Sequence, residues 1–567
     1  MIRQLLTLVL LSSALSACGL LGGGSSGDGG KKIFRYNQTG GLSSLDPAFA
    51  RNRANIWATT QIYNGLVSLN KSLDVVNELA DSYKISEDGK TYTFHIRKGV
   101  RFHDNPCFPS GRGREVVAED FVYTFKRILD KNTASTGSWI FSDKVLRDAK
   151  GEISDTCFVA VNDTTLRIHL RERSSIFINV LAMPYAFVVP KEAVEKYGKE
   201  FRSNPVGTGA FMMKKWVEKQ SLVLEKNVNY WKRDASGNSL PYLDGIQVSF
   251  IEDPNQAYIT FTDGNLDFLT GITGNSRDQI LDKQTGKIKE QFKSKFEVDK
   301  VPYLLTEYVG FLIEGDDEKK NPFLNKKVRQ ALSYATNRQG ITDFTRNKLG
   351  FPGDFGFVPN ALPSFDTSRV KGYKFDLKKA QELLKEAGYP NGKDFPETTL
   401  YTHSSDKEIA EILQKRWKDI GITVNIQTNQ FTTHQELVDN GKATFFRGSW
   451  IGDYPDAENF LKLFYGKKEN FAPAGPNKTH YSNPEFDKLY DQALKIDDNS
   501  NRFSRYDLYS KMDSLMIADA PIIVLYYDEV IQLRQKRIKN LEANAMNILL
   551  LENVDIKDPN EATAEKK

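Results

Sequence analysis

The chain has 567 residues, of which 40% are hydrophobic and 26% charged, and its 77 basic and 73 acidic side chains leave a formal net charge of +4. This length allows about three or four domains, and the composition is that of a folded globular protein rather than a disordered or fibrous chain. Because the charges nearly balance and form no long block of one sign, they give no support for nucleic-acid binding.

The N-terminus has the features of a secretory signal peptide. Arg3 is followed by the apolar stretch Leu5–Leu11 and by small residues before Cys18. The four residues ending in Cys18 resemble the bacterial lipobox, which implies removal of residues 1–17 and lipidation of Cys18. The Gly/Ser-rich residues 18–30 are then a flexible tether at a membrane outside the cytoplasm. An ordinary signal peptide with a chance cysteine is the alternative.

Alternating and helical patterns interleave from Lys32 onward, which indicates a mixed α/β protein. Tyr92, Phe94 and Ile96 alternate with polar residues and predict a half-buried strand, and 121–129 carries the apolar stripe of a helix.

Cys107 and Cys157 are the two cysteines beyond Cys18. In an oxidising compartment an even pair predicts a disulfide, while two independent buried thiols are the alternative. Neither cysteine belongs to a CxxC pair or lies near a histidine cluster, so no metal site is expected there.

The second half of the chain contains a clearer unit. Asp376 is placed to cap a helix that Gly388 ends. A strand near 398–402, a helix with apolar residues between Ile409 and Ile420, and a strand over 422–427 then follow. This order predicts a crossover between parallel strands.

Several separated blocks, in this order, resemble the large solute-binding proteins of bacterial ABC importers, family 5, and within it the group of peptide, oligopeptide, dipeptide and nickel receptors. The resemblance covers nearly the whole mature chain. The blocks are 86–94 (SEDGKTYTF), 97–103 (RKGVRFH), 118–122 (AEDFV), 205–211 (PVGTGAF), 229–231 (NYW), 241–246 (PYLDGI), 328–335 (VRQALSYA), 387–390 (AGYP), 450–456 (WIGDYPD) and 520–523 (APII).

This resemblance implies a two-lobed α/β fold of the periplasmic-binding-protein type with an extra inserted domain, whose lobes close on ligand. We expect a composite lobe I from 31–70, 201–300 and 520–553, an inserted domain II over 71–200, a lobe III over 301–519 and a C-terminal tail over 554–567. The resemblance further implies peptide as ligand, an ABC permease and ATPase as partners, and a monomer without cofactor or metal.

The block 445–453 (FFRGSWIGD) carries the expected ligand site. In similar peptide receptors the aspartate at the position of Asp453 receives the α-ammonium group, and the arginine at the position of Arg447 meets a carboxylate of short ligands. A peptide of arbitrary sequence offers only its termini and main chain as constant features, so an anion for the amine is chemically reasonable. We expect ligand contacts from Arg447, Trp450, Ile451, Gly452, Asp453 and Tyr454.

Taken without the family, these residues also have plainer interpretations. Asp453 is suited to capping a turn before Pro455, and Trp450 to a place in the core. Asp456 is expected to be a structural acid and Glu458 a solvated neighbour.

Catalysis is not expected, because the chain has no HExxH pair, GxSxG elbow or P-loop. The remaining alternatives are the same fold binding a nickel complex, haem, opine or oligosaccharide, and a receptor or adhesion lipoprotein without transport.

Overall fold

One continuous sheet links the two lobes. The computed structural model describes residues 30–272, 274–496 and 498–557. Its eleven-stranded sheet has the order β15-β14-β16-β12-β17-β11-β1-β10-β9-β8, with β13 paired to β17. The strands are β1 Ile33–Asn37, β8 Phe211–Val217, β9 Ser221–Lys226, β10 Gly245–Ser249, β11 Phe268–Thr270, β12 Phe296–Phe311, β13 Phe351–Pro352, β14 Thr398–His403, β15 Val424–Asn429, β16 Phe445–Ile451 and β17 Ile522–Gln535.

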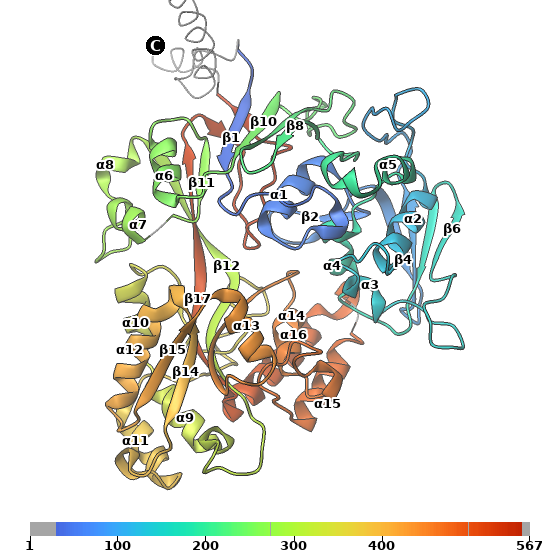
Figure 1. Cartoon of the computed structure of the whole chain (residues 1–567). Coiled ribbons are helices and arrows are strands. Elements are labelled where there is room, and N and C mark those ends of the chain that lie inside the picture. The colour runs from blue at the N-terminus through green and yellow to red at the C-terminus, as the bar shows by residue number, and fades with distance from the viewer. Residues whose placement is uncertain (1–29, 273, 497, 558–567) are drawn as a thin grey trace, which may run out of the picture.

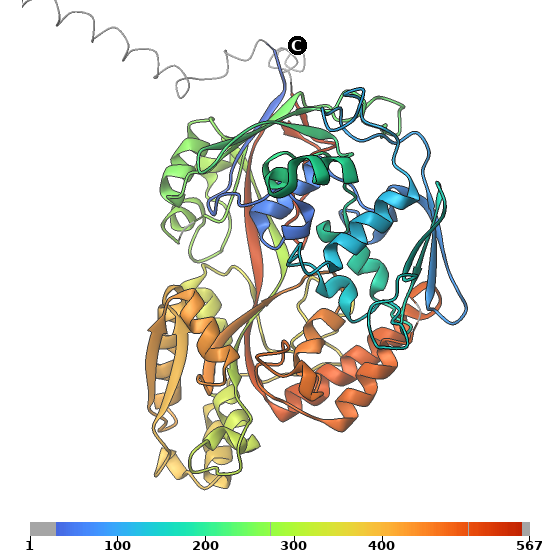
Figure 2. The same ribbon diagram turned by 45° about the vertical axis from the view of Figure 1, so that its right-hand side comes forward.

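The long strands β12 and β17 pass from lobe I into lobe III (Figures 1 and 2). Residues 296–302 of β12 pair with 529–535 of β17, and residues 306–310 pair with 522–527, with register shifts between Pro302 and Thr306 and between Glu307 and Tyr308. An interrupted ladder bends more easily than a regular one, so the lobes meet at a natural hinge. The pairing of β12 with β17 thus shifts register between Tyr527 and Glu529 of β17.

Lobe I and domain II share one hydrophobic core. Domain II has its own antiparallel sheet of order β4-β5-β7-β6, and Tyr92, Phe94 and Ile96 are buried in it as predicted. The core continues from there into the β1 side of lobe I. The strands are β4 Ala80–Ile85, β5 Thr91–Ile96, β6 Phe158–Asn162 and β7 Thr165–His169, with a small pair β2 Val67–Leu69 and β3 Val75–Asn77 at the junction.

Short helices cover these two parts (Figure 1). The predicted helix over 121–129 is confirmed as α2, whose first turn is stabilised by the side chain of Asp120, which accepts from the Val117 N–H. Lobe I carries α1 Arg53–Ile62, α6 Pro254–Thr262, α7 Gly274–Ile280 and α8 Glu290–Lys293, and domain II carries α2 Ala118–Leu129, α3 Trp139–Ser142, α4 Phe177–Leu181 and α5 Lys191–Tyr197. The closing segment of lobe I forms the pair β18 Ile538–Lys539 and β19 Asp555–Ile556.

Lobe III has a core on each face of its sheet. In β17, Ile522 and Val524 enter one core while Ile523 and Leu525 enter the other, as the alternation of a strand requires. The predicted strand, helix and strand are confirmed as β14, α12 and the parallel strand β15, and Asp376 caps α11. The helices are α9 Lys326–Tyr334, α10 Arg338–Thr345, α11 Leu377–Glu386, α12 Lys407–Lys418, α13 Phe431–Asp439, α14 Glu458–Leu461, α15 Pro484–Ala493 and α16 Asp498–Asp519.

Polar contacts bridge the lobes at two places. On the hinge side, Arg277 of α7 donates to the Thr345 carbonyl at 3.0 Å. On the far side, the Ser175 N–H of domain II donates to the Leu494 carbonyl at 3.2 Å, and Arg173 donates to the Lys495 carbonyl at 3.4 Å. Lobe III is therefore connected to lobe I at one place and to domain II at the other.

The predicted disulfide is wrong, because both cysteines are free thiols. Half-buried Cys107 has Arg114 and, from α5, Glu192 and Lys196 as charged neighbours. Buried Cys157 has Lys126 of α2 and Asp155 instead. The two thiols thus lie in different surroundings of domain II. Burial raises the pKa of each thiol to about 11.

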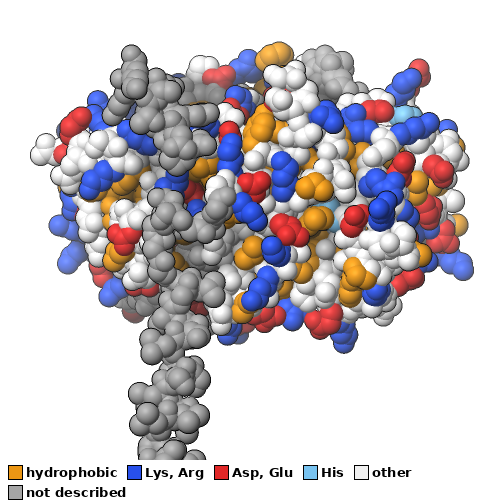
Figure 3. Space-filling model, turned by 90° about the horizontal axis from the view of Figure 1, so that it is seen from above, with side chains coloured by type: hydrophobic (Ala, Val, Ile, Leu, Met, Phe, Trp, Pro, Cys, Tyr) orange, Lys and Arg blue, Asp and Glu red, His pale blue; other side chains and the backbone are white. Residues whose placement is uncertain are grey.

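The signal peptide, Cys18 and nearly all of the tether lie outside the described residues, as do residues 558–567 of the expected tail. In the part of the chain that the structure describes, no helix combines the length and the apolar character needed to cross a membrane. Basic and acidic side chains are interspersed on the face of lobe I seen from above (Figure 3), in keeping with the nearly balanced charge of the chain.

Candidate ligand-binding site

Strand β16 positions the residues of the expected site. Its odd-numbered side chains share one face of the sheet, where Ser449 and Ile451 are exposed, and Asp453 follows directly after the strand. Trp450 points to the opposite face and donates from Nε1 to Asn459 Oδ1 at 2.9 Å. The exposed side chains of this face are thus those of Ser449 and Ile451 at the end of β16, whereas Phe445 and Arg447 on the same face are buried.

One edge of β16 has no partner strand along most of its length. Residues 445–451 pair with β12, but on the other side β14 pairs only through Tyr401 with Phe446. The Arg447 carbonyl on that edge accepts from His434 Nε2 at 2.8 Å. The main-chain groups of Ser449 and Ile451 point the same way, because directions alternate along an antiparallel strand. Among the described residues, no strand covers them.

Asp453 lies at the end of this open edge, and its carboxylate is in contact with solvent. Asn459 makes two hydrogen bonds with Asp453. The Nδ2 atom of Asn459 donates to Asp453 Oδ2 at 3.3 Å, and the Oδ1 atom of Asn459 accepts from the Asp453 N–H at 3.0 Å. The surrounding protein nevertheless desolvates the carboxylate and raises its pKa.

Domain II approaches lobe III next to Asp453, where Tyr454 packs into the core that lobe I and domain II share. Burial raises the pKa of Tyr185, and the negative charge of Asp453 raises it further, so the two side chains lie within electrostatic reach of each other. Tyr185 belongs to the short 3-10 helix Pro184–Ala186 of domain II. Asp453 therefore lies where lobe III approaches domain II.

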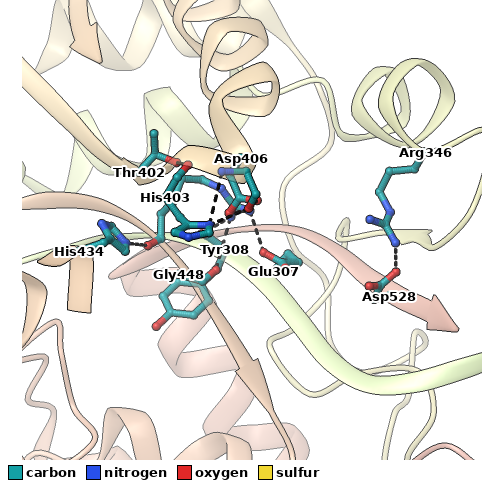
Figure 4. Close-up of polar contacts among 11 residues, drawn as sticks. Glu307, Tyr308, Arg346, Thr402, His403, Asp406, His434, Gly448 and Asp528 are labelled. Atoms are coloured by element: carbon teal, nitrogen blue, oxygen red, sulfur yellow. Dashed lines mark hydrogen bonds and ion pairs between the residues drawn. The ribbon is translucent and has the colours of Figure 1, made fainter. Parts of the chain in front are cut away.

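Arg447 is buried behind the same face of the sheet. Its Nη2 lies 2.7 Å from Glu307 Oε2 and 3.4 Å from Asp406 Oδ2, while Nη1 donates to the Tyr308 carbonyl at 2.6 Å. Glu307 and Asp406 converge from β12 and from the N-terminal end of α12 (Figure 4). The guanidinium group thus has protein partners already.

The charges of this cluster do not cancel. Burial raises the pKa of Glu307, and Arg447 opposes that shift. Burial disfavours the charge on Arg447, but the carboxylates of Glu307 and Asp406 outweigh it and raise the arginine pKa. Two carboxylates therefore surround one guanidinium group. The neighbouring Arg346 is paired with Asp528 (Figure 4). The charges of Glu307 and Asp528 both raise the pKa of Arg346, so the whole group has three carboxylates and two guanidinium groups.

Comparison with known proteins identifies the fold. The profile of the bacterial extracellular solute-binding proteins, family 5 Middle, matches residues 74–472. The chain belongs to family 5. It is 28% identical over 546 residues to the oligopeptide-binding protein OppA of Bacillus subtilis, covering 92% of this chain and 94% of that protein. It is 29% identical over 480 residues to heme-binding protein A of Haemophilus influenzae, covering 82% and 81%.

Solved family 5 structures agree with this assignment. The periplasmic binding protein DppA of Helicobacter pylori, in complex with the peptide STSA, superposes with a TM-score of 0.73 at 25% identity and covers 93% of this chain and 98% of its own. HbpA2 of Haemophilus parasuis has a TM-score of 0.77 at 24% identity, with coverages of 93% and 100%, and supports the fold alone.

The residues predicted for the site of this family 5 protein divide into two groups. Asp453 and Ile451 are exposed to solvent, and Ile451 is 49% exposed. Arg447 is buried, and Gly452 lies against Leu304 and Phe460. Trp450 and Tyr454 also contact protein: Trp450 packs at the edge of a lobe III core, and the Tyr454 hydroxyl donates to Glu458. Ligand contact remains a prediction for every one of them.

The acids after Asp453 both turn out to be structural. Asp456 accepts from Arg505 and from the Tyr509 hydroxyl, each at 2.7 Å, which confirms its expected role. The expectation that Glu458 is solvated is wrong, because it is buried and accepts from two tyrosine hydroxyls. These contacts fix the loop below Asp453 to α15 and α16.

Sequence reasoning missed several residues of this cleft. The period of two along β16 was sufficient to find Ser449, which lies on the same face as Arg447 and Ile451. Glu307 and Asp406 lie 140 and 41 residues from Arg447, and Tyr185 belongs to another domain. No local pattern marks these residues, because the pairing of the sheet strands and the approach of domain II to lobe III bring them together.

Proposed function

We propose that this protein captures peptides in the cleft between lobe III and domain II and delivers them to an ABC importer. The observation that carries the proposal is the open edge of β16, which ends at the exposed carboxylate of Asp453. An extended peptide can add to such an edge through its main chain, with its ammonium group at Asp453. Both contacts are independent of the peptide's side chains.

The relatives support this proposal through what they bind. OppA of Bacillus subtilis is an oligopeptide-binding protein. The solved structure of DppA of Helicobacter pylori contains the peptide STSA. Other relatives are named for glutathione and heme. A free carboxylate at the end of a strand edge favours a ligand with an amine and a main chain, because an unpaired charge in a closing cleft is costly.

The lipidation of Cys18 completes the proposal, since it holds the receptor at the membrane that contains the permease and its ATPase. A lobe arrangement that closes on ligand lets the permease distinguish the loaded from the empty receptor. We expect the wild type to incorporate a labelled fatty acid and Cys18→Ala to lose that label. Equal labelling of the two proteins, or an unlabelled wild type, would contradict the lipid anchor.

The ligand itself is tested by native mass spectrometry of the soluble protein starting at residue 31, followed by denaturing extraction. A ladder of mixed peptide masses is expected on the wild type and its loss on Asp453→Asn. The matched control is Asp419→Asn at the C-terminal end of α12, where the carboxylate pairs with Arg416 away from the strand edge. A single non-peptide mass, or equal peptide occupancy in all three proteins, would overturn the proposal.

A further inference from the structure

The part of the Arg447 cluster that solvent reaches is acidic. The Arg447 side chain is 1% exposed, whereas those of Glu307 and Asp406 are 15% and 33% exposed. A ligand group that approaches this point meets carboxylate oxygens before it meets the guanidinium group. We propose that Glu307 and Asp406 make the receptor select peptides that place a neutral or basic group here and reject those that end here in a free carboxylate.

The position of the cluster along a bound peptide follows from the strand register. Glu307 lies directly opposite Ser449, four residues before Asp453. An extended chain advances about 3.3 Å per residue, so this level is about 13 Å along the strand from Asp453. The inference rests on the proposed function, in which a peptide begins at Asp453 and runs antiparallel to β16. About the fourth or fifth peptide residue, and the terminal carboxylate of a four-residue peptide, then reaches the cluster.

Arg447 has little capacity left for a ligand carboxylate. Its Nη1 is used by the Tyr308 carbonyl and its Nη2 by the two carboxylates. The remaining donor, Nε, is buried. A carboxylate arriving here would add a third negative charge where the surrounding protein already disfavours charge on Glu307. A lysine or arginine side chain, or the amide of a continuing peptide, meets no such repulsion.

Tetra-alanine with a free C-terminal carboxylate and the same peptide as its C-terminal amide test this directly, because they differ by one charge at the cluster. Calorimetric titration of the wild type should favour the amide by at least about tenfold. The preference should fall toward unity in Glu307→Gln and in Asp406→Asn. The control Glu411→Gln removes an exposed carboxylate from the outer face of α12 and should keep the wild-type ratio.

Hexapeptides with lysine or glutamate at residue 4 provide a second readout. The lysine peptide should bind the wild type more tightly than the glutamate peptide does, and this difference in affinity should disappear in Glu307→Gln and in Asp406→Asn. Should Glu307→Gln fold poorly, Asp406→Asn carries the test because its side chain is a third exposed.

Equal amide-to-acid ratios in the wild type and both variants, or a wild type that prefers the acid, would overturn the charge selection. Failure of the proposed function gives a different result: none of these peptides binds the wild type, or Asp453→Asn leaves their binding unchanged.

Discussion

The pairing of Asp453 with a peptide ammonium group makes the sharpest prediction. In the structure the carboxylate has one side-chain hydrogen bond, from Asn459 at 3.3 Å, and its pKa is raised by desolvation. It therefore lacks a full complement of partners before ligand arrives. Asp453→Asn removes the charge and keeps an oxygen acceptor in nearly the same shape, so the local loop should be preserved.

The magnitude follows from the partial exposure of the group. Loss of one partner from a charge pair that binding desolvates costs about 2–5 kcal/mol. Asp453 keeps contact with solvent in the structure, and asparagine still accepts a hydrogen bond, so the lower part of that range applies. We expect a loss of about 2–3 kcal/mol, or about 30- to 150-fold in affinity.

A double-mutant cycle separates this pairing from other effects of the substitution. One oligopeptide is titrated calorimetrically with its amine free and acetylated, against the wild type and Asp453→Asn. Acetylation should weaken binding to the wild type by a similar factor and have little further effect on the variant. If the two changes are instead additive, Asp453 does not contact the amine and the assignment of the ligand's N-terminus is refuted.

Three further predictions concern the scaffold. Burial raises the pKa of Asp513 to about 7, so the stability that this group contributes is complete below about pH 4 and is lost as the pH rises through 7. Asp513→Asn should remove this pH dependence, which is measured as the urea midpoint of unfolding at pH 5 and at pH 8. A difference between the midpoints of wild type and variant that is equal at both pH values would contradict this expectation. Glu458→Ala leaves the buried hydroxyls of Tyr454 and Tyr490 without their acceptor and should cost about 2–5 kcal/mol of unfolding free energy, whereas exposed Glu469→Ala should cost little. The denatured soluble protein should take up two alkyl groups, at Cys107 and Cys157, without prior reduction; an unreactive protein that gains them only after reduction would restore the disulfide.

Local patterns were sufficient for much of the fold. The alternation of Tyr92 to Ile96 and the helix over 121–129 are decided by residues a few positions apart, and both are confirmed. The disulfide failed for the opposite reason. An even number of cysteines does not determine how far apart the sulfur atoms lie in the folded chain. The two thiols lie beside different helices of domain II.

The burial of Glu458 is a second feature that residues nearby in the sequence do not predict. A glutamate near two other acids and a proline is usually solvated, and its neighbours in sequence predict that. It is buried because α15 brings the Tyr490 hydroxyl to it, 32 residues further along the chain. The energetic reason is that buried carboxylates are retained where hydrogen-bond donors converge on them.

The sequence by itself determined the family, the alternating strands and the position of Asp453, because these depend on ordered blocks and short-range periodicity. Only the tertiary structure decided what surrounds Arg447. The register of β12 on β16 brings Glu307 to it, and the start of α12 adds Asp406. Charge pairing depends on distances of a few ångströms between segments far apart in the chain, and that is set by packing rather than by any local pattern.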